Sequence, residues 1–175
     1  GQGMGEVNLG RAFDGLARIV RDQRPEDLFT ASGQTRVFTG RISDTSQPLR
    51  VTLAWTDAPG STVGNAFNND LDLTITMGTN TYAGNNFSGA YSRTGGSADA
   101  RNNVESVFLP AGTAADFTVR VTAANINSDG VPNYGASLDQ DFALIIYNAV
   151  STTVPVISAA GSTLLVESCF PSNGA

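Results

Sequence analysis

Acidic and amide side chains gather in two segments of the sequence, Asn68–Asp72 and Asp99–Glu105. Within the first segment, Asp70 and Asp72 stand two positions apart, so in an extended strand they point to the same face at a separation of about 7 Å. Two carboxylates at that distance repel each other unless a positive charge lies beside them. The spacing therefore predicts that a cation, or a cationic side chain, belongs to this part of the molecule.

The ligands that these segments offer are hard oxygen atoms from carboxylates, amides and loop carbonyls. Calcium takes about 6–8 such oxygens in a flexible shell, whereas zinc and copper favour nitrogen and sulfur ligands. We therefore expect calcium to bind here, although the sequence has no EF-hand pattern. The candidate metal ligands are Asp70, Asp72, Asn86, Asp99, Asn102 and Glu105.

Two other interpretations of the same residues stay open. Arg101 could pair with Asp70 or Asp72, in which case ion pairs and turn capping alone would account for the acidic residues. The carboxylate pairs could also serve as the acid and base of a glycosidase. Such pairs on antiparallel sandwiches are more often structural, which favours the other two interpretations.

Composition excludes several kinds of chemistry. The 175 residues include no histidine and no lysine, and the formal net charge is -6. A Ser-His-Asp or Cys-His nucleophile, a histidine-bound zinc and a phosphate-binding lysine are therefore excluded within this chain. The acidic balance argues against nucleic-acid binding, and no apolar run reaches the roughly 18 residues of a membrane helix. The single cysteine, Cys169, has no partner for an internal disulfide.

The elements that must position the acidic residues are short strands. Apolar and polar residues alternate along several segments rich in Val, Ile, Thr, Phe and Tyr, each bounded by Gly, Pro, Asn or Asp. Because no helical pattern separates them, we expect an all-β fold, an antiparallel β-sandwich or jelly roll. The predicted strands are Thr35–Ile42, Leu49–Thr56, Asp70–Thr76, Thr81–Ala83, Val104–Leu109, Phe117–Ala123 and Phe142–Asn148.

The ends of the chain follow other patterns. Apolar residues recur at helical spacing between Leu9 and Val20, with Asn8 as a plausible N-cap, which predicts a helix over residues 8–20. We expect three parts: a helix and tail over residues 1–30, a β-sandwich over 31–150, and a linker with the first strand of a following domain over 151–175. The loops 85–103 and 125–140 exceed the usual length, which is typical of functional or disordered loops.

Several motifs, in order along residues 1–148, resemble subtilisin-like serine peptidases. Gly1–Ala12 resembles the "G-x-G-x-V-N-L-x-x-A" segment in the final helix of their catalytic domains, after the catalytic serine. Further motifs are similar to the C-terminal β-sandwich that a subset of these enzymes carries. They are Pro48–Pro59 ("PLRVTLVWTDAP"), Asn69–Leu73 ("NDLDL"), Tyr82–Phe87 ("Y-x-G-N-x-F") and Asp99–Glu105 ("D-x-x-NNVE").

The resemblance implies an accessory domain, similar in architecture to the P-domain of proprotein convertases. It would pack on the catalytic domain of the same chain, bind calcium and support stability, and the catalytic Asp, His and Ser would lie before Gly1. Carried over by position, it implies Asn86 and Asp99 as calcium ligands, followed by Asp70 and Asp72. The parent would be a secreted bacterial endopeptidase, and Glu167–Gly174 resembles the start of an Ig-like module.

A different function also fits a jelly roll, namely binding of a carbohydrate or another surface. Aromatic side chains in or near the loops could form a stacking platform for sugars, or could instead cover the sheet edges. These side chains are Tyr82, Phe87, Tyr91 and Tyr134. Trp55 lies on the apolar face of a predicted strand, so we expect it in the core rather than in a binding platform.

Overall fold

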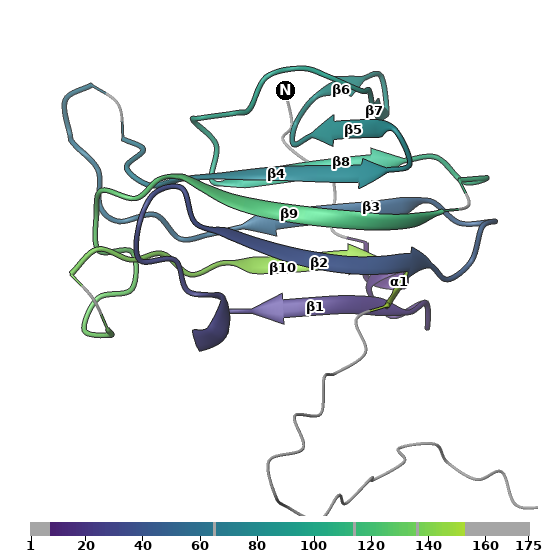
Figure 1. The fold of residues 1–175 in the computed structure, drawn as a ribbon, viewed down its shortest axis with the longest axis horizontal. Coiled ribbons are helices and arrows are strands. Elements are labelled where there is room, and N and C mark those ends of the chain that lie inside the picture. Colours follow the sequence, from purple (N-terminus) through teal and green to yellow (C-terminus); the bar gives the residue numbers. More distant parts are fainter. Residues whose placement is uncertain (1–7, 65, 114, 136, 153–175) are drawn as a thin grey trace, which may run out of the picture.

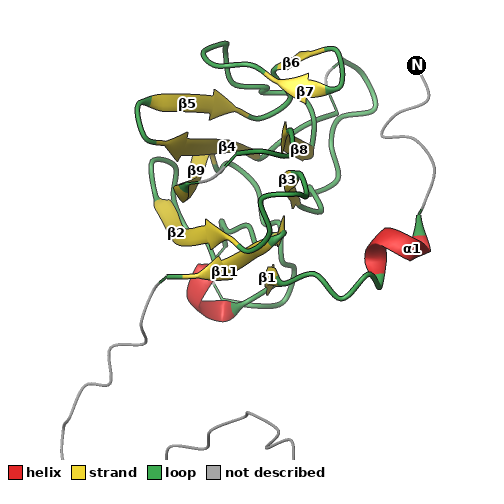
Figure 2. Ribbon diagram, turned by 90° about the vertical axis from the view of Figure 1, so that its right-hand side faces the viewer, coloured by secondary structure: helices red, strands yellow, loops and turns green. Residues whose placement is uncertain are grey.

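Strands with alternating apolar and polar residues form two antiparallel sheets that face each other (Figures 1 and 2). The computed structural model describes residues 8–152, apart from residues 65, 114 and 136. One sheet has the order β1-β10-β3-β8, with strands Arg18–Asp22, Ala143–Tyr147, Leu49–Ala54 and Val104–Leu109. The other has the order β11-β2-β9-β4-β5, with strands Ala149–Ser151, Thr35–Ile42, Asp116–Asn125, Asp70–Met77 and Asn80–Ala83. The predicted all-β antiparallel sandwich is confirmed, while the jelly-roll connectivity stays a prediction.

Three short elements accompany the sheets. Strands β6 (Phe87–Ser88) and β7 (Tyr91–Ser92) form a small antiparallel ribbon, and a 3-10 turn spans Pro25–Asp27. The helix α1 covers Leu9–Ala12. The ribbon β6-β7 belongs to the long connection between β5 and β8, which carries several of the candidate ligands.

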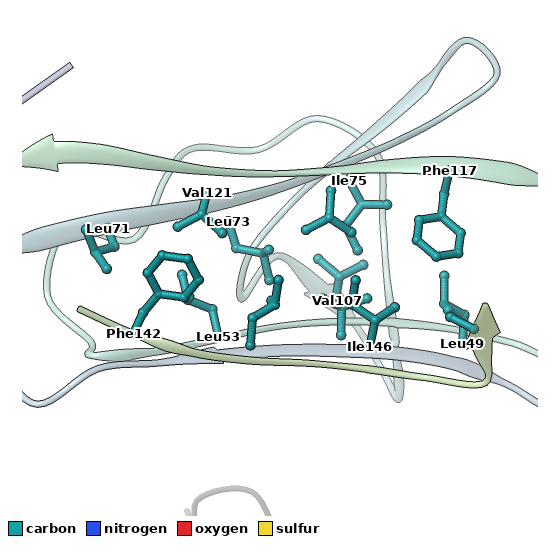
Figure 3. Close-up of a cluster of buried hydrophobic side chains, with 14 of the residues drawn as sticks. Leu49, Leu53, Leu71, Leu73, Ile75, Val107, Phe117, Val121, Phe142 and Ile146 are labelled. Carbon is teal, nitrogen blue, oxygen red and sulfur yellow. The ribbon is translucent and has the colours of Figure 1, made fainter. Parts of the chain in front are cut away.

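Alternation along the strands places one apolar face of each sheet in a shared core (Figure 3). In β3 every second residue is buried, and in β4 the residues Leu71, Leu73 and Ile75 are buried in the same way. The side chains from the two sheets meet between the ribbons in Figure 3. Trp55, just after β3, is 6% exposed, which confirms its predicted place in the core.

The predicted helix over residues 8–20 is wrong beyond Ala12. Asn8 does cap a helix, because its Oδ1 accepts the backbone N–H of Arg11 at 3.0 Å, but that helix has only four residues. Farther along, Arg18–Asp22 forms strand β1 and pairs with β10. A short isolated helix is marginal in water, whereas β1 gains backbone hydrogen bonds from β10 and packs Ile19 against the core.

Residues 153–175 lie outside the described part of the chain. This range includes Cys169 and the Ig-like segment Glu167–Gly174, so those predictions are not addressed by the structure. Within the described residues, no helix has both the length and the apolar character that crossing a membrane requires.

Candidate functional site

Four carboxylates from three parts of the chain form one electrostatic group, which we call the acid cluster: Asp70, Asp72, Asp99 and Glu105. Asp70 and Asp72 alternate with the buried leucines of β4 and are therefore on the face of that strand away from the core. Glu105 comes from β8 in the opposite sheet, and Asp99 from the loop before it. The sequence predicted these four residues as ligands, and the structure brings them into mutual interaction.

Glu105 connects the two sheets through a hydrogen bond. Its Oε2 accepts the backbone N–H of Leu73 at 2.6 Å, and the side chain is buried, with 1% of the residue exposed. The pairing of β4 with β5 stops at Thr74 and Ala83, so strand β5 does not supply an acceptor to the Leu73 N–H. The carboxylate of Glu105 takes that place, which explains why an acidic residue is held inside an apolar sandwich.

A glycine makes room for this carboxylate. Gly84 is buried, and a Cβ atom built on it would lie 2.2 Å from Oε2 of Glu105. Such a contact is far below van der Waals separation, so any larger residue at this position would displace Glu105. The glycine in the segment Tyr82–Phe87 is therefore needed because it leaves room for a carboxylate of the acid cluster.

Asn85 positions the loop carboxylate. Its φ of 57° is in the left-handed region, which Asn tolerates better than most residues. The amide Nδ2 donates to Oδ2 of Asp99 at 2.8 Å, and the Oδ1 accepts the N–H of Ser106 at 3.0 Å. Asn102 Nδ2 donates to the same oxygen of Asp99 at 2.6 Å. Asp99 is thus fixed by two amide side chains just before β8 begins.

The structure places Asn86 elsewhere. Its Nδ2 donates to the carbonyl oxygens of Arg93 and Gly95, and its Oδ1 accepts from Nε of Arg93 at 3.0 Å. These bonds hold the ends of the β6-β7 ribbon together. The neighbouring Asn85, which is not among the predicted ligands, is the asparagine that contacts Asp99. The two adjacent asparagines look alike in sequence, and only the reversed backbone at Asn85 separates their roles.

The charges of the acid cluster oppose one another. Burial, together with the charges of Asp72 and Asp99, raises the pKa of Asp70 to about 6. Burial also raises the pKa of Glu105 to about 8, against the opposing hydrogen bond from Leu73. The pKa of Asp72 is raised by burial and by the charge of Asp99. Burial acts to raise the pKa of Asp99 too, but the hydrogen bonds from Asn102 and Asn85 outweigh it and lower that pKa overall.

Three oxygens of the acid cluster are buried without a hydrogen-bond donor among the described residues: Asp70 Oδ1, Asp72 Oδ1 and Glu105 Oε1. The ion pairs of the described residues do not involve these carboxylates or Arg101. The alternative in which Arg101 pairs with Asp70 or Asp72 is therefore wrong. A buried acceptor with no donor costs free energy, so this arrangement calls for a proton or a cation.

The donor set suits calcium better than a transition metal. In the part of the chain that the structure describes, no three His, Cys, Asp or Glu side chains converge as a metal-binding group. A cation here would therefore take only part of its shell from carboxylates, and amide or carbonyl oxygens and water would complete it, as calcium tolerates. Beside Asp70 lies a hollow of about 200 Å³, whose lining also includes Trp55, Arg101, Asn102 and Asn103.

Two further polar residues near the cluster have structural roles. Asp57 accepts the N–H groups of Asn68 and Asn69 at 2.6 and 2.9 Å, so it caps the segment that leads into β4. Asn69 is 2% exposed, and both the nitrogen and the oxygen of its side-chain amide form hydrogen bonds with the loop after β9. Its position before an alternating strand gave no indication of that role.

Two of the four candidate platform side chains, Tyr82 and Phe87, are packed against other residues. Tyr82 packs against the core, and the ring of Phe87 lies 5.4 Å from that of Phe108. Tyr91 and Tyr134 are the exposed ones, at 42% and 51%, and neither takes part in a ring pair among the described residues. The geometry therefore gives no support to the carbohydrate-binding alternative.

Comparison with protein-family models finds no match to this chain, and comparison with curated proteins finds none either.

Proposed function

We propose that this chain provides the accessory β-sandwich of a secreted bacterial subtilisin-like serine endopeptidase, and that calcium bound at the acid cluster stabilises it. In this proposal the sandwich is not catalytic and supports a catalytic domain of the same protein. The observation that carries the calcium part is the set of buried, unpaired carboxylate oxygens contributed by both sheets. The motifs of residues 1–148 support the family part.

The ion would hold the two sheets together. Glu105 is on β8 and Asp72 is on β4, so a cation that both carboxylates share would join strands of opposite sheets. It would also replace the repulsion among these groups with attraction, and it would satisfy the oxygens that lack donors. Stabilisation by a ligand that binds only the folded state grows with its concentration, which suits the calcium-rich environment of secreted proteins.

Thermal unfolding of the 175-residue chain, in chelator and in calcium, tests the calcium part. A calcium concentration of about 100 times Kd should raise the midpoint by about 5–10 °C. Asp72→Asn is the informative variant, because Asp72 makes no side-chain hydrogen bond among the described residues while its Oδ1 is buried. It should lose most of the calcium-dependent rise yet be no less stable than the wild type in chelator, since a repulsive charge is removed.

Two controls sharpen this test. Asp116→Asn removes an exposed charge that pairs with Arg41, outside the cluster, and should keep the full calcium response. Asp99→Ala should abolish the response and also lower stability in chelator, because the amides of Asn85 and Asn102 lose their acceptor. A wild-type midpoint that is the same in chelator and in saturating calcium would refute the calcium site.

The family part has its own test. The resemblance predicts that the sequence encoded shortly before Gly1 contains the Gly-Thr-Ser-Met motif around the catalytic serine of subtilisin-like peptidases. The purified chain by itself should not hydrolyse peptides, since the triad would lie in that preceding domain. An upstream sequence without this motif, or peptide hydrolysis by the chain alone, would contradict the proposal.

A further inference from the structure

A second pair of acidic residues meets in the long loop between β9 and β10, on a part of the chain outside the acid cluster. Asp129 and Asp139 are ten positions apart, yet they lie opposite each other in an isolated β-bridge. The N–H of Gly130 donates to the carbonyl oxygen of Asp139 at 2.9 Å. The N–H of Val131 donates to Oδ1 of the Asp139 side chain at 3.0 Å. The loop thus closes around the Asp139 carboxylate.

The carboxylate of Asp139 is fully buried, with 0% of the residue exposed. Its second oxygen, Oδ2, has no hydrogen-bond donor among the described residues. Oδ1 of Asp129 is also buried and also lacks a donor among them. Gly135 lies over this point, because a Cβ atom built on it would sit 3.7 Å from Asp139 Oδ2. Two carboxylates therefore face each other in a place that water does not reach freely.

In the described part of the chain, no arginine forms an ion pair with either of these carboxylates. The ion pairs found in the described residues leave Asp129, Asp139 and the nearby Asp141 without an arginine. Burial, the charge of Asp129 and a hydrogen bond between the two carboxyl groups when one of them is protonated raise the pKa of Asp139, against the hydrogen bonds from Val131 and Gly130. Asp141, close by in sequence, also has a raised pKa, from burial and then from the charges of Asp139 and Asp22. Asp141 adds negative charge near the pair, while Arg24 lines the hollow beside Val131 and Asp141.

Either a shared proton or a bound cation can resolve such a contact. The N–H of Val131 points at Oδ1 of Asp139, and a donor aimed at a carboxylate favours its ionised form. The oxygens left over are carboxylate oxygens, the ligands that calcium prefers. We propose that Asp129 and Asp139 bind a second calcium ion, separate from the acid cluster, and that this ion fastens the loop 126–140 to the sandwich.

Asn69 provides a physical connection between the two sites. It directly precedes Asp70 of the acid cluster, and its Nδ2 donates to the carbonyl oxygens of Ser128 and Asp139 at 3.1 and 3.3 Å. An ion at Asp139 would therefore order the same backbone that Asn69 holds. The second site requires no feature of the acid cluster, so either proposal can fail without the other.

Calcium titration of the chelator-treated full chain by calorimetry tests this inference through stoichiometry. The wild type should bind two ions, and Asp72→Asn and Asp139→Asn should each bind one. Asp139→Asn keeps an oxygen that can accept from Val131, which favours folding. Asp129→Asn provides a second variant at a half-buried residue, and Asp116→Asn serves as the charge-matched control that keeps both ions.

The outcomes separate the two proposals. One ion in the wild type that persists in Asp139→Asn and Asp129→Asn, but not in Asp72→Asn, would overturn the second site and leave the acid cluster as the calcium site. One ion that is lost only in the two loop variants would support the second site and refute the first. No binding at all, with a wild-type midpoint unaffected by calcium, would mean a shared proton only and overturn the inference.

A local readout complements the stoichiometry. The amide hydrogen of Val131 reports directly on the loop, since its acceptor is Asp139. Calcium should slow hydrogen exchange of the segment 126–140 at least about tenfold in the wild type and in Asp72→Asn, and it should have no effect on that segment in Asp139→Asn. Equal exchange with and without calcium in the wild type would also overturn the second site.

Discussion

At the scale of single residues, the most unusual group is the carboxyl of Glu105. It is buried inside the sandwich, accepts one backbone hydrogen bond and faces the like charges of Asp70, Asp72 and Asp99. Its pKa of about 8 in the folded chain compares with 4.5 for an unperturbed glutamate. Between pH 4.5 and about pH 8, the metal-free folded chain therefore holds a proton at Glu105 that the unfolded chain has already released.

This difference predicts how stability depends on pH in chelator. Because the folded state binds more protons, the free energy of unfolding should fall as the pH rises from about 5 to 8, by at most about 1.4 kcal/mol for each pH unit from this one group. Glu105→Gln should remove that part of the slope, since glutamine can still accept from Leu73 and has no charge to bury. Urea unfolding at several pH values measures it.

Glu26→Gln is the matched control for this prediction. Glu26 is exposed and its pKa is lowered by its own backbone hydrogen bond and by the charge of Arg21. The ionised form of Glu26 therefore stabilises the folded chain, and this contribution develops below pH 5 as the carboxyl loses its proton. It stays constant between pH 5 and 8. If Glu105→Gln unfolds with the same slope as the wild type over that interval, the carboxyl of Glu105 is ionised throughout and the assigned shift is wrong.

The pairing of Asp70 with Asp72 could be predicted from the sequence because it is local, whereas Asp99 and Glu105 reach them from a loop and from the opposite sheet. Two aspartates at alternating positions must share a strand face, whatever the rest of the chain does. Asn86 illustrates where that reasoning stops. Whether its amide or that of Asn85 reaches Asp99 depends on one backbone torsion, the φ of 57° at Asn85, and on strands that the sequence does not place in space.

At the scale of elements, the bounds of a strand were predicted correctly where the residue pattern of the strand itself marked both of its ends. Strands β2 and β8 have the predicted bounds, because alternation and flanking turn residues marked both ends. Strand β1 was missed because Arg18–Asp22 becomes a strand through its partner β10, which lies more than a hundred residues away in sequence. The strands β6 and β7 have two residues each, too few to show a period.

The loop after β9 should depend on one asparagine more than on any turn residue of its own. The amide of Asn69 accepts from the N–H groups of Asn127 and Ser128 and donates to Gln140 Oε1 at 2.9 Å. Asn69→Ala would leave several of these buried groups without partners, at about 1–3 kcal/mol each. We expect a loss of about 3 kcal/mol in the free energy of unfolding, measured in urea.

Asn125→Ala is the comparison at the same end of β4. Asn125 lies at the end of β9 and is exposed, and its amide makes one hydrogen bond, to the carbonyl oxygen of Asn68 at 3.0 Å. Because water can replace that bond, the loss should stay below about 1 kcal/mol. Similar losses in the Asn69 and Asn125 variants would show that the buried amide does not hold the loop.

At the scale of the whole molecule, the sandwich is closed at both ends by polar side chains that join the two sheets. Glu105 and Asn69 act where β4 and β8 begin. Asn148 acts at the other end, between β10 of one sheet and β11 of the other. It is fully buried, and its φ of 67° turns the chain from one sheet to the next.

Asn148 also fixes a second crossing between the sheets, the turn from β2 to β3. Its Oδ1 accepts from the hydroxyl of Ser43 and from the N–H of Asp44 at 2.8 and 2.9 Å, and its Nδ2 donates to the carbonyl oxygens of Asp44 and Gln47. Two connections of the fold thus depend on one amide. Its substitution should weaken the sandwich as a unit rather than loosen one loop.

Comparing Asn148→Gly with Asn148→Ala separates the two roles of this residue. Glycine keeps the left-handed backbone and loses the hydrogen bonds, so Asn148→Gly should lower the free energy of unfolding by about 3 kcal/mol. Alanine loses the same bonds and strains the backbone, which adds about 1 kcal/mol. Urea unfolding followed by Trp55 fluorescence and by circular dichroism should give one shared midpoint for each variant. Separate midpoints by the two probes, or equal losses for glycine and alanine, would contradict this account of how the sandwich is closed.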